Sequence, residues 1–134
     1  MRYVMDSSFM TGHELIDGQH KQLFDAVNSL IDSCEKGKGQ EDLLKNLDFL
    51  NEYTIKHFFE EEQIQKACNY PDYENHKKIH EAFKAAVREF KVKMIMKGAS
   101  ADLVTEVRKV IGDWLGTHIK GQDVKLGAYI KARS

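Results

Sequence analysis

The apolar residues of this chain recur at steps of three and four, and this helical period constrains the fold more than any other feature of the sequence. The period is clear over four segments, which we place at about residues 17–36, 41–67, 72–97 and 101–120. The single proline, Pro71, lies between the second and third segments, where it cannot continue a helix. The sequence therefore predicts an all-α chain with four helices.

The connections between these segments are only a few residues long, and this determines how the helices pack. A short loop returns each helix beside its predecessor, so that neighbours run antiparallel. We predict an up-down-up-down four-helix bundle that takes up residues 1–134 as one domain, because 134 residues are too few for two independent cores. Residues 1–16 are expected to form an irregular N-terminal arm, and residues 124–134 a short C-terminal tail.

Charge and composition exclude several classes of protein. The 20 basic and 21 acidic residues give a net charge of -1, with no basic run of the kind that binds nucleic acid or anionic membranes. No stretch approaches the ~20 apolar residues of a membrane span, and the N-terminus lacks the apolar run of a signal peptide. We expect a cytoplasmic protein with neither nucleic acid nor membrane as a partner.

Five of the 6 histidines stand on the apolar stripes, where leucine would be the ordinary residue. Glu61 shares such a stripe, and a buried ionised carboxylate requires a cation. Residues four apart project from one face of a helix, which pairs His57 with Glu61 and His76 with His80. One such histidine would be an ordinary hydrogen-bonded core residue, but several at one level indicate a metal site.

The topology of the bundle brings these polar residues to one level. His20 begins the first helix and His118 ends the fourth, while the two pairs lie at the end of the second helix and the start of the third. In an up-down-up-down bundle these four positions share one end of the molecule. Asp123, five residues after His118, adds a second carboxylate. The candidate metal ligands are His20, His57, Glu61, His76, His80, His118 and Asp123.

Five imidazoles and two carboxylates are too many ligands for one metal ion but suit two. If both carboxylates and a hydroxide bridge the ions, three histidines complete six-fold coordination of one ion. The other two histidines leave the second ion five-coordinate, with one open position. Imidazole and carboxylate suit iron, zinc or copper, so the spacing alone leaves the metal undecided.

These residues resemble the hemerythrins, and among them the single-domain bacteriohemerythrins. The resemblance covers nearly the whole chain and is carried by the run of residues 16–24 together with the spacings His57-x-x-x-Glu61, His76-x-x-x-His80 and His118-x-x-x-x-Asp123. It implies two non-haem iron ions joined by a bridging oxo or hydroxo group. By this resemblance one iron is held by His76, His80 and His118, the other by His20 and His57, and both by Glu61 and Asp123.

The resemblance also implies reversible O2 binding, as a carrier, store or sensor rather than an enzyme. Each ferrous ion can give one electron and the bridging hydroxide can give its proton, so O2 at the five-coordinate iron becomes hydroperoxide as the bridge becomes oxo. Reversal of these steps releases O2. Leu115 is an oxygen-pocket position in the family and, with Phe24, belongs to a mostly apolar layer one turn from the ligands. Plain core packing explains that layer as well as a pocket does.

The alternative function is a di-iron redox enzyme, or a protein that handles iron or nitric oxide. Bundles of the oxidase and ferroxidase kind carry Glu-x-x-His pairs on two helices. This sequence contains no Glu-x-x-His, and we therefore favour reversible O2 binding.

The interval between His118 and Asp123 predicts a distortion of the fourth helix. Five residues of regular α-helix turn a side chain about 140° away, so both side chains cannot reach one site from an undisturbed helix. Gly121 is the natural place for a wide turn or a helix end.

Five other polar or reactive residues are expected to take no part in the metal chemistry. Cys34 and Cys68 fall at opposite ends of the bundle, roughly 30 Å apart by helical rise, which predicts two free thiols. Glu60 and Glu62, which flank Glu61, are expected to be solvated. His13 precedes the first helix and is expected to be an ordinary surface histidine.

Overall fold

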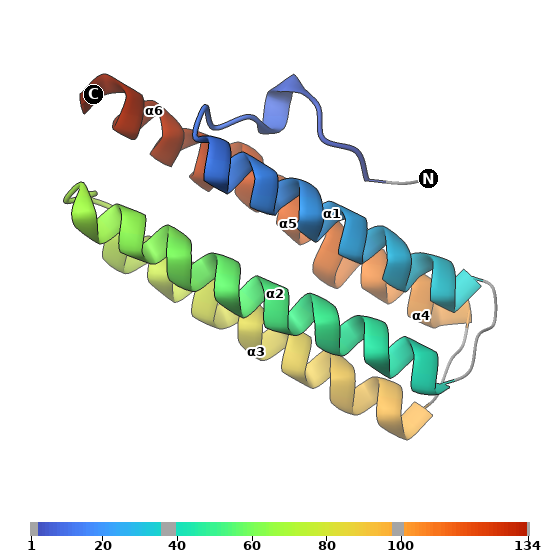
Figure 1. The fold of residues 1–134 in the computed structure, drawn as a ribbon. Helices are drawn as coiled ribbons and strands as arrows, with labels where there is room; N and C mark the ends of the chain where they lie inside the picture. The colour runs from blue at the N-terminus through green and yellow to red at the C-terminus, as the bar shows by residue number, and fades with distance from the viewer. Residues whose placement is uncertain (1–2, 36–39, 98–100, 134) are drawn as a thin grey trace.

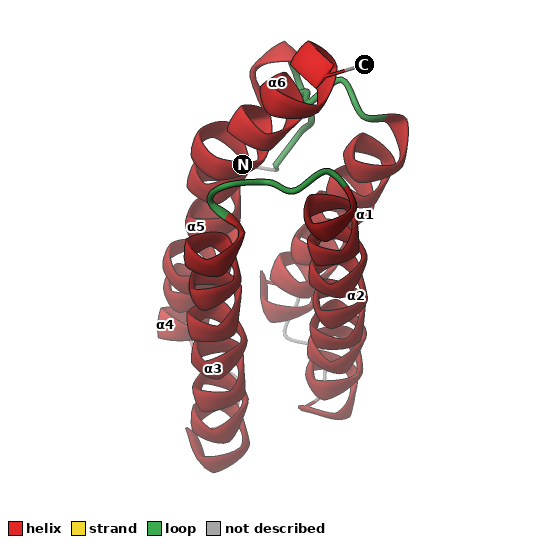
Figure 2. Cartoon of the chain, turned by 90° about the vertical axis from the view of Figure 1, so that its left-hand side faces the viewer, coloured by secondary structure: helices red, strands yellow, loops and turns green. Residues whose placement is uncertain are grey.

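The computed structural model describes residues 3–35, 40–97 and 101–133, and almost all of these are helical. Three long helices, α1 (Glu14–Glu35), α2 (Gln40–Ala67) and α3 (Tyr73–Lys97), form three rods of a bundle. The fourth rod runs without a break through α4 (Ala101–Glu106), a π-helical turn (Val107–Gly112), α5 (Asp113–His118), a second π-helical turn (Ile119–Asp123) and α6 (Val124–Arg133). Figures 1 and 2 show the predicted antiparallel four-helix bundle, with the N-terminal arm lying along α1.

The apolar stripes of all four rods meet in one continuous core. Its fully buried side chains include Leu30, Leu47, Val107 and Ile111. A second, smaller cluster joins Ile16 and Leu126 at the end of the bundle where α1 begins. No described helix has both the length and the apolar character that crossing a membrane requires.

The end of α2 is set by its own sequence. Asn69 adopts a positive φ of 55°, a conformation that asparagine tolerates at the end of a helix. The N–H of Tyr70 then donates to the carbonyl of Gln65 at 2.9 Å, and Pro71 prevents any continuation. The turn places the end of α2 and the start of α3, which carry four of the candidate ligands, at the same end of the bundle.

The first helix begins at Glu14, three residues before the predicted start, because local side chains cap it. The carboxylate of Asp17 accepts hydrogen bonds from the Thr11 and Gly12 N–H groups at 2.8 and 3.2 Å, and Gly12 supplies the positive φ of 87°. His13 lies partly exposed at this cap, where its Nδ1 accepts from the N–H of Ile16 at 3.4 Å. The arm before it is irregular except for one 3-10 turn, Ser7–Phe9.

The prediction of a tail after residue 123 was wrong, because those residues form α6. The wide second π-helical turn allows the helix to continue past Asp123, and Leu126 is then buried against Ile16 and Tyr70. A Cβ at Gly127 would clash with the backbone of Thr11, so glycine permits α6 to approach the arm. The predicted end of the first helix at residue 36, and the outer limits of arm and tail at residues 1 and 134, lie outside the described residues.

Candidate metal centre

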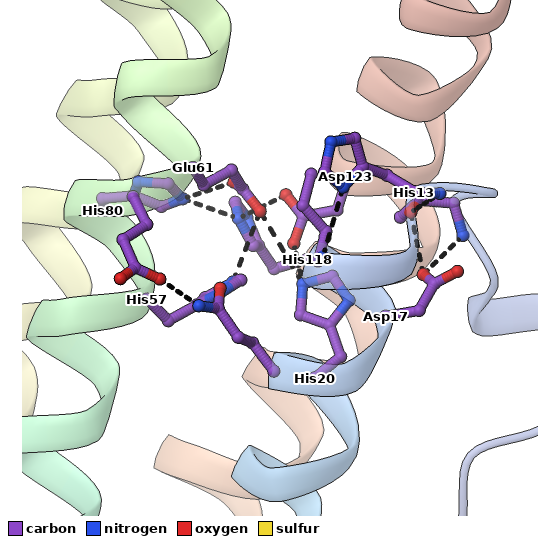
Figure 3. Close-up of polar contacts among 12 residues, drawn as sticks. His13, Asp17, His20, His57, Glu61, His80, His118 and Asp123 are labelled. Carbon is purple, nitrogen blue, oxygen red and sulfur yellow. Dashed lines mark hydrogen bonds and ion pairs between the residues drawn. The ribbon is translucent and has the colours of Figure 1, made fainter.

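The structure brings all seven candidate ligands together inside one end of the bundle. Each of them is buried, and they come from all four rods: His20 on α1, His57 and Glu61 on α2, His76 and His80 on α3, His118 at the end of α5 and Asp123 at the end of the second π-helical turn. Figure 3 shows the histidines grouped around the carboxylates of Glu61 and Asp123. Residues up to 103 positions apart in the sequence thus meet in one layer.

These side chains form two overlapping groups, each with ligand atoms that lie within 4.8 Å of one another. A three-histidine group contains Glu61, His76, His80, His118 and Asp123. A two-histidine group contains His20, His57, Glu61 and Asp123. Glu61 and Asp123 belong to both groups, which is the arrangement that two ions sharing two carboxylates would need.

The second π-helical turn is what allows Asp123 to join His118. The N–H of Val124 donates to the carbonyl of Ile119, five residues back, so the turn is wider than an α-helical one. The carboxylate of Asp123 therefore lies 3.3 Å from His118 Nε2, although five residues separate the two in the sequence. This confirms the predicted distortion of the fourth helix, with Gly121 inside it.

Each carboxylate faces imidazoles from several helices. Glu61 Oε2 lies 3.3 Å from His57 Nε2, while Glu61 Oε1 lies 3.2 and 3.4 Å from the Nε2 atoms of His76 and His80. Asp123 Oδ2 lies 2.9 Å from His20 Nε2, and its Oδ1 lies 3.0 Å from His76 Nε2. The Nε2 atoms and the carboxylate oxygens therefore point into a common space.

The atoms at the centre of the site lack hydrogen-bond partners among the described residues. Both oxygens of Glu61 and of Asp123 are buried in this state, and so is Nε2 of His20 and of His57. Burying polar atoms without hydrogen bonds costs roughly several kcal/mol each, so the arrangement requires compensation. Two cations would satisfy these atoms together, and the imidazole and carboxylate donors fit iron.

The electrostatics of the site also favour a cation. Burial opposes the ionisation of Glu61 and Asp123, but the surrounding histidines hold the pKa of each carboxyl below its usual range. Burial lowers the pKa of His20 and His76, yet the two carboxylates outweigh it and raise both values to about 9. The carboxylates are therefore anionic and draw positive charge into the centre.

A second layer of hydrogen bonds holds the histidine rings, and sequence reasoning missed it. His80 Nδ1 donates to Glu62 Oε2 at 2.9 Å, and Gln65 Nε2 lies 2.9 Å from His76 Nδ1. His57 Nδ1 donates to Gln19 Oε1 at 2.7 Å, and the amide group of Gln19 in turn donates to Glu60. The expectation of a solvated side chain was therefore wrong for Glu62, which is buried against His80, whereas Glu60 stays partly exposed and accepts from Gln19.

Aromatic rings close the site on the side of the bundle centre. Phe58, which the sequence analysis did not single out, stacks on His80 with centroids 3.7 Å apart and an interplanar angle of 2°. Trp114 stacks on His118 at 4.6 Å and on Phe83 at 4.0 Å, and Phe24 and Leu115 are buried in the core cluster that also contains Phe58 and Phe83. Phe58 follows His57 directly, so the same turn of α2 supplies a candidate ligand and its aromatic cover.

The remaining singled-out residues lie apart from the cluster. His13 belongs to neither metal-binding group, and Figure 3 shows it beside Asp17 at the start of α1. Cys34 and Cys68 are both free thiols, as predicted. Burial raises the pKa of Cys34 to about 11, which leaves this thiol unreactive at neutral pH.

Comparison with known proteins agrees with this geometry. Residues 11–130 match the family model of the hemerythrin HHE cation binding domain. The chain is 32% identical over 120 residues to a bacteriohemerythrin of Pseudomonas aeruginosa, covering 90% of this chain and 76% of the relative. It is 36% identical over 123 residues to a myohemerythrin of Sipunculus nudus, covering 92% and 89%. A crystal structure of a single-residue variant aligns with a TM-score of 0.79 at 30% identity, over 96% of this chain and 95% of the other.

Proposed function

Because the chain belongs to the hemerythrin family, we propose that it binds O2 reversibly at a non-haem di-iron centre. The observation that carries the proposal is the pair of overlapping ligand groups, which share the carboxylates of Glu61 and Asp123. A single ion would leave part of this buried set unsatisfied, whereas two ions would engage both groups. O2 is the partner we assign to the site, in a carrier, store or sensor role and without net turnover.

Iron ligation follows the two groups. We assign His76, His80 and His118 to one iron, His20 and His57 to the other, and Glu61 and Asp123 to both. Two irons and a bridging hydroxo group would supply the two electrons and the proton that O2 binding needs, and would take them back on release. The unequal number of histidines supports an open position on the iron of the two-histidine group.

The chain's own contribution to reversibility is a dry lining. Leu115 and Phe24 are 2% and 1% exposed, and both belong to the buried core that contains Phe58, the ring stacked on His80. Apolar side chains there exclude water, which would otherwise cause the irreversible loss of the bound oxygen. We assign both residues to the O2 pocket.

The proposal is tested by optical spectroscopy of the reduced, iron-loaded chain. Exposure to air should produce a charge-transfer band that disappears under vacuum and returns on readmission of air. Steady consumption of O2 and a reductant, with no reversible band, would instead indicate a redox enzyme.

The pocket is tested by Leu115→Asn, which places a hydrogen-bonding amide in the apolar layer at similar volume. Iron content should be unchanged, while the oxygenated band should decay faster than in the native chain. Decay is compared at equal iron occupancy, and equal rates would remove Leu115 from the pocket.

A further inference from the structure

A chain of hydrogen bonds links a surface carboxylate to one of the candidate ligands. Glu60 is half-buried on α2, and it accepts a hydrogen bond from the side-chain amide of Gln19 on α1. The oxygen of that same amide accepts from Nδ1 of His57 at 2.7 Å. Gln19 is 7% exposed and His57 is 1% exposed, so no solvent competes at the inner link.

The direction of these bonds follows from the chemistry of the three groups. A side-chain amide has a donor end and an acceptor end, and an ionised carboxylate only accepts. Glu60 therefore accepts a hydrogen bond from the NH2 group of Gln19, and the amide oxygen of Gln19 then faces His57. An oxygen at that place requires a proton on Nδ1, and the neutral His57 ring then presents an unprotonated Nε2, 3.3 Å from Glu61.

Gln65, the glutamine beside His76, has no carboxylate among the described residues that orients its amide. Gln65 is fully buried and lies 2.9 Å from His76 Nδ1 through its nitrogen, while its oxygen has no hydrogen-bond partner among the described residues. No described carboxylate selects one orientation of this amide by a hydrogen bond. Gln19 and Gln65 thus differ in one feature: a carboxylate, Glu60, fixes the orientation of the Gln19 amide.

We propose that Glu60 is a positioning residue, which acts through Gln19 to hold His57 in the orientation and tautomer that bind metal. The proposal rests on the proposed function only in that His57 is a metal ligand. It concerns neither the identity of the metal nor its reaction with O2. Hydrogen-bond partners of ligating histidines change metal affinity by about 10–100-fold, and Glu60 acts one bond further out.

The test uses Zn2+ binding to the full chain, because zinc changes no oxidation state and is independent of O2 chemistry. Glu60→Met removes the acceptor and keeps the length of the side chain. It should weaken Zn2+ binding at the two-histidine group by about tenfold, the lower end of the range for such partners. Glu60→Gln, which retains an acceptor oxygen, should restore most of the affinity.

Glu52→Met is the matched control, because Glu52 is exposed on the same helix and its loss removes the same charge. A double-mutant cycle with Gln19→Leu then asks whether Glu60 acts through Gln19. In the Gln19→Leu background, Glu60→Met should have no further effect. Equal affinities of Glu60→Met and Glu52→Met, or a tenfold loss that persists without Gln19, would overturn the proposal.

A second measurement, NMR of the histidine rings, requires only the substitution of the half-buried Glu60. In the zinc-loaded native chain, NMR of the histidine rings should show a slowly exchanging proton on Nδ1 of His57. In Glu60→Met nothing fixes the Gln19 amide with its oxygen on that proton, so the proton should exchange faster and the slow signal should be lost. A signal that survives unchanged, or a native chain in which His57 binds no Zn2+, would contradict the role of Glu60.

Discussion

The two ends of this bundle are built on the same helices but from opposite kinds of side chain. At the end where α1 begins, the core positions carry five histidines and two carboxylates, all buried. At the end where α1 finishes, they carry aliphatic residues such as Leu30, Leu43, Leu47 and Met94. Apolar packing stabilises the second end by itself, whereas the first end depends on a ligand for its buried polar atoms. The same helical spacing therefore positions the residues of the apolar core at one end and those of the binding site at the other.

The largest effect is expected from His80→Ala, at the polar end of the bundle. It removes a ligand from the three-histidine group, so the chain should lose at least one iron and the stability that iron provides. At a thousandfold excess of metal over Kd, each lost site removes roughly 4 kcal/mol. Iron per chain and the melting temperature measure both effects.

His13→Ala is the matched control, since His13 lies outside both ligand groups. It should leave the iron content unchanged. If His80→Ala retained full iron and the native melting temperature, His80 would not belong to the centre.

The opposite end is tested by Leu47→Ala. Leu47 is fully buried, and large-to-small changes of this kind cost about 2–5 kcal/mol. The loss should be the same in the iron-loaded and the chelator-treated chain, because Leu47 lies in the aliphatic end. Chemical denaturation of both forms gives the comparison, with Ile55→Ala as an exposed control on the same helix. A loss that depended on iron would mean that the two ends are not energetically separate.

The smallest effect is expected at the arm, which contacts the bundle through Tyr3. Its hydroxyl donates to Asp113 Oδ1 at 2.8 Å, and burial together with this carboxylate raises the pKa of Tyr3 to about 12. The folded-state pKa lies above the unfolded one, so the contribution is complete below about pH 10 and is lost as the pH rises through 12.

The NMR signal of the Asn28 side-chain amide reports on the docked arm, because this amide bonds the Tyr3 backbone at 2.8 Å. In the native chain it should shift between pH 10 and 12 as Tyr3 ionises. In Tyr3→Phe that transition should be absent. The same titration in both proteins would assign it to another group.

The four-helix architecture was predictable because the apolar residues recur with a helical period. The stripes through Leu47 and Ile111 mark helices, and short connections leave only one way to pack them. The convergence of the histidines then followed from topology alone. Even the irregular turn between His118 and Asp123 was accessible, because a five-residue interval does not fit an α-helix.

The hydrogen bonds behind the ligands were not predictable in the same way. Glu62 is next to Glu61, and only the packing of α2 against α3 decides that it meets His80. A signal was present, since Phe58, Glu62 and Gln65 recur at steps of four and three beside the ligand stripe. Helix α6 was missed for a related reason, because Leu126 becomes a core residue only when Ile16 and Tyr70 lie beside it.

Counting the metal ions tests most directly whether the one buried cluster holds two of them. The chain is saturated with ferrous iron without air, freed of excess metal and analysed for iron and protein. The two overlapping ligand groups predict two irons per chain. A single iron per chain at saturation, or none, would contradict a two-metal site.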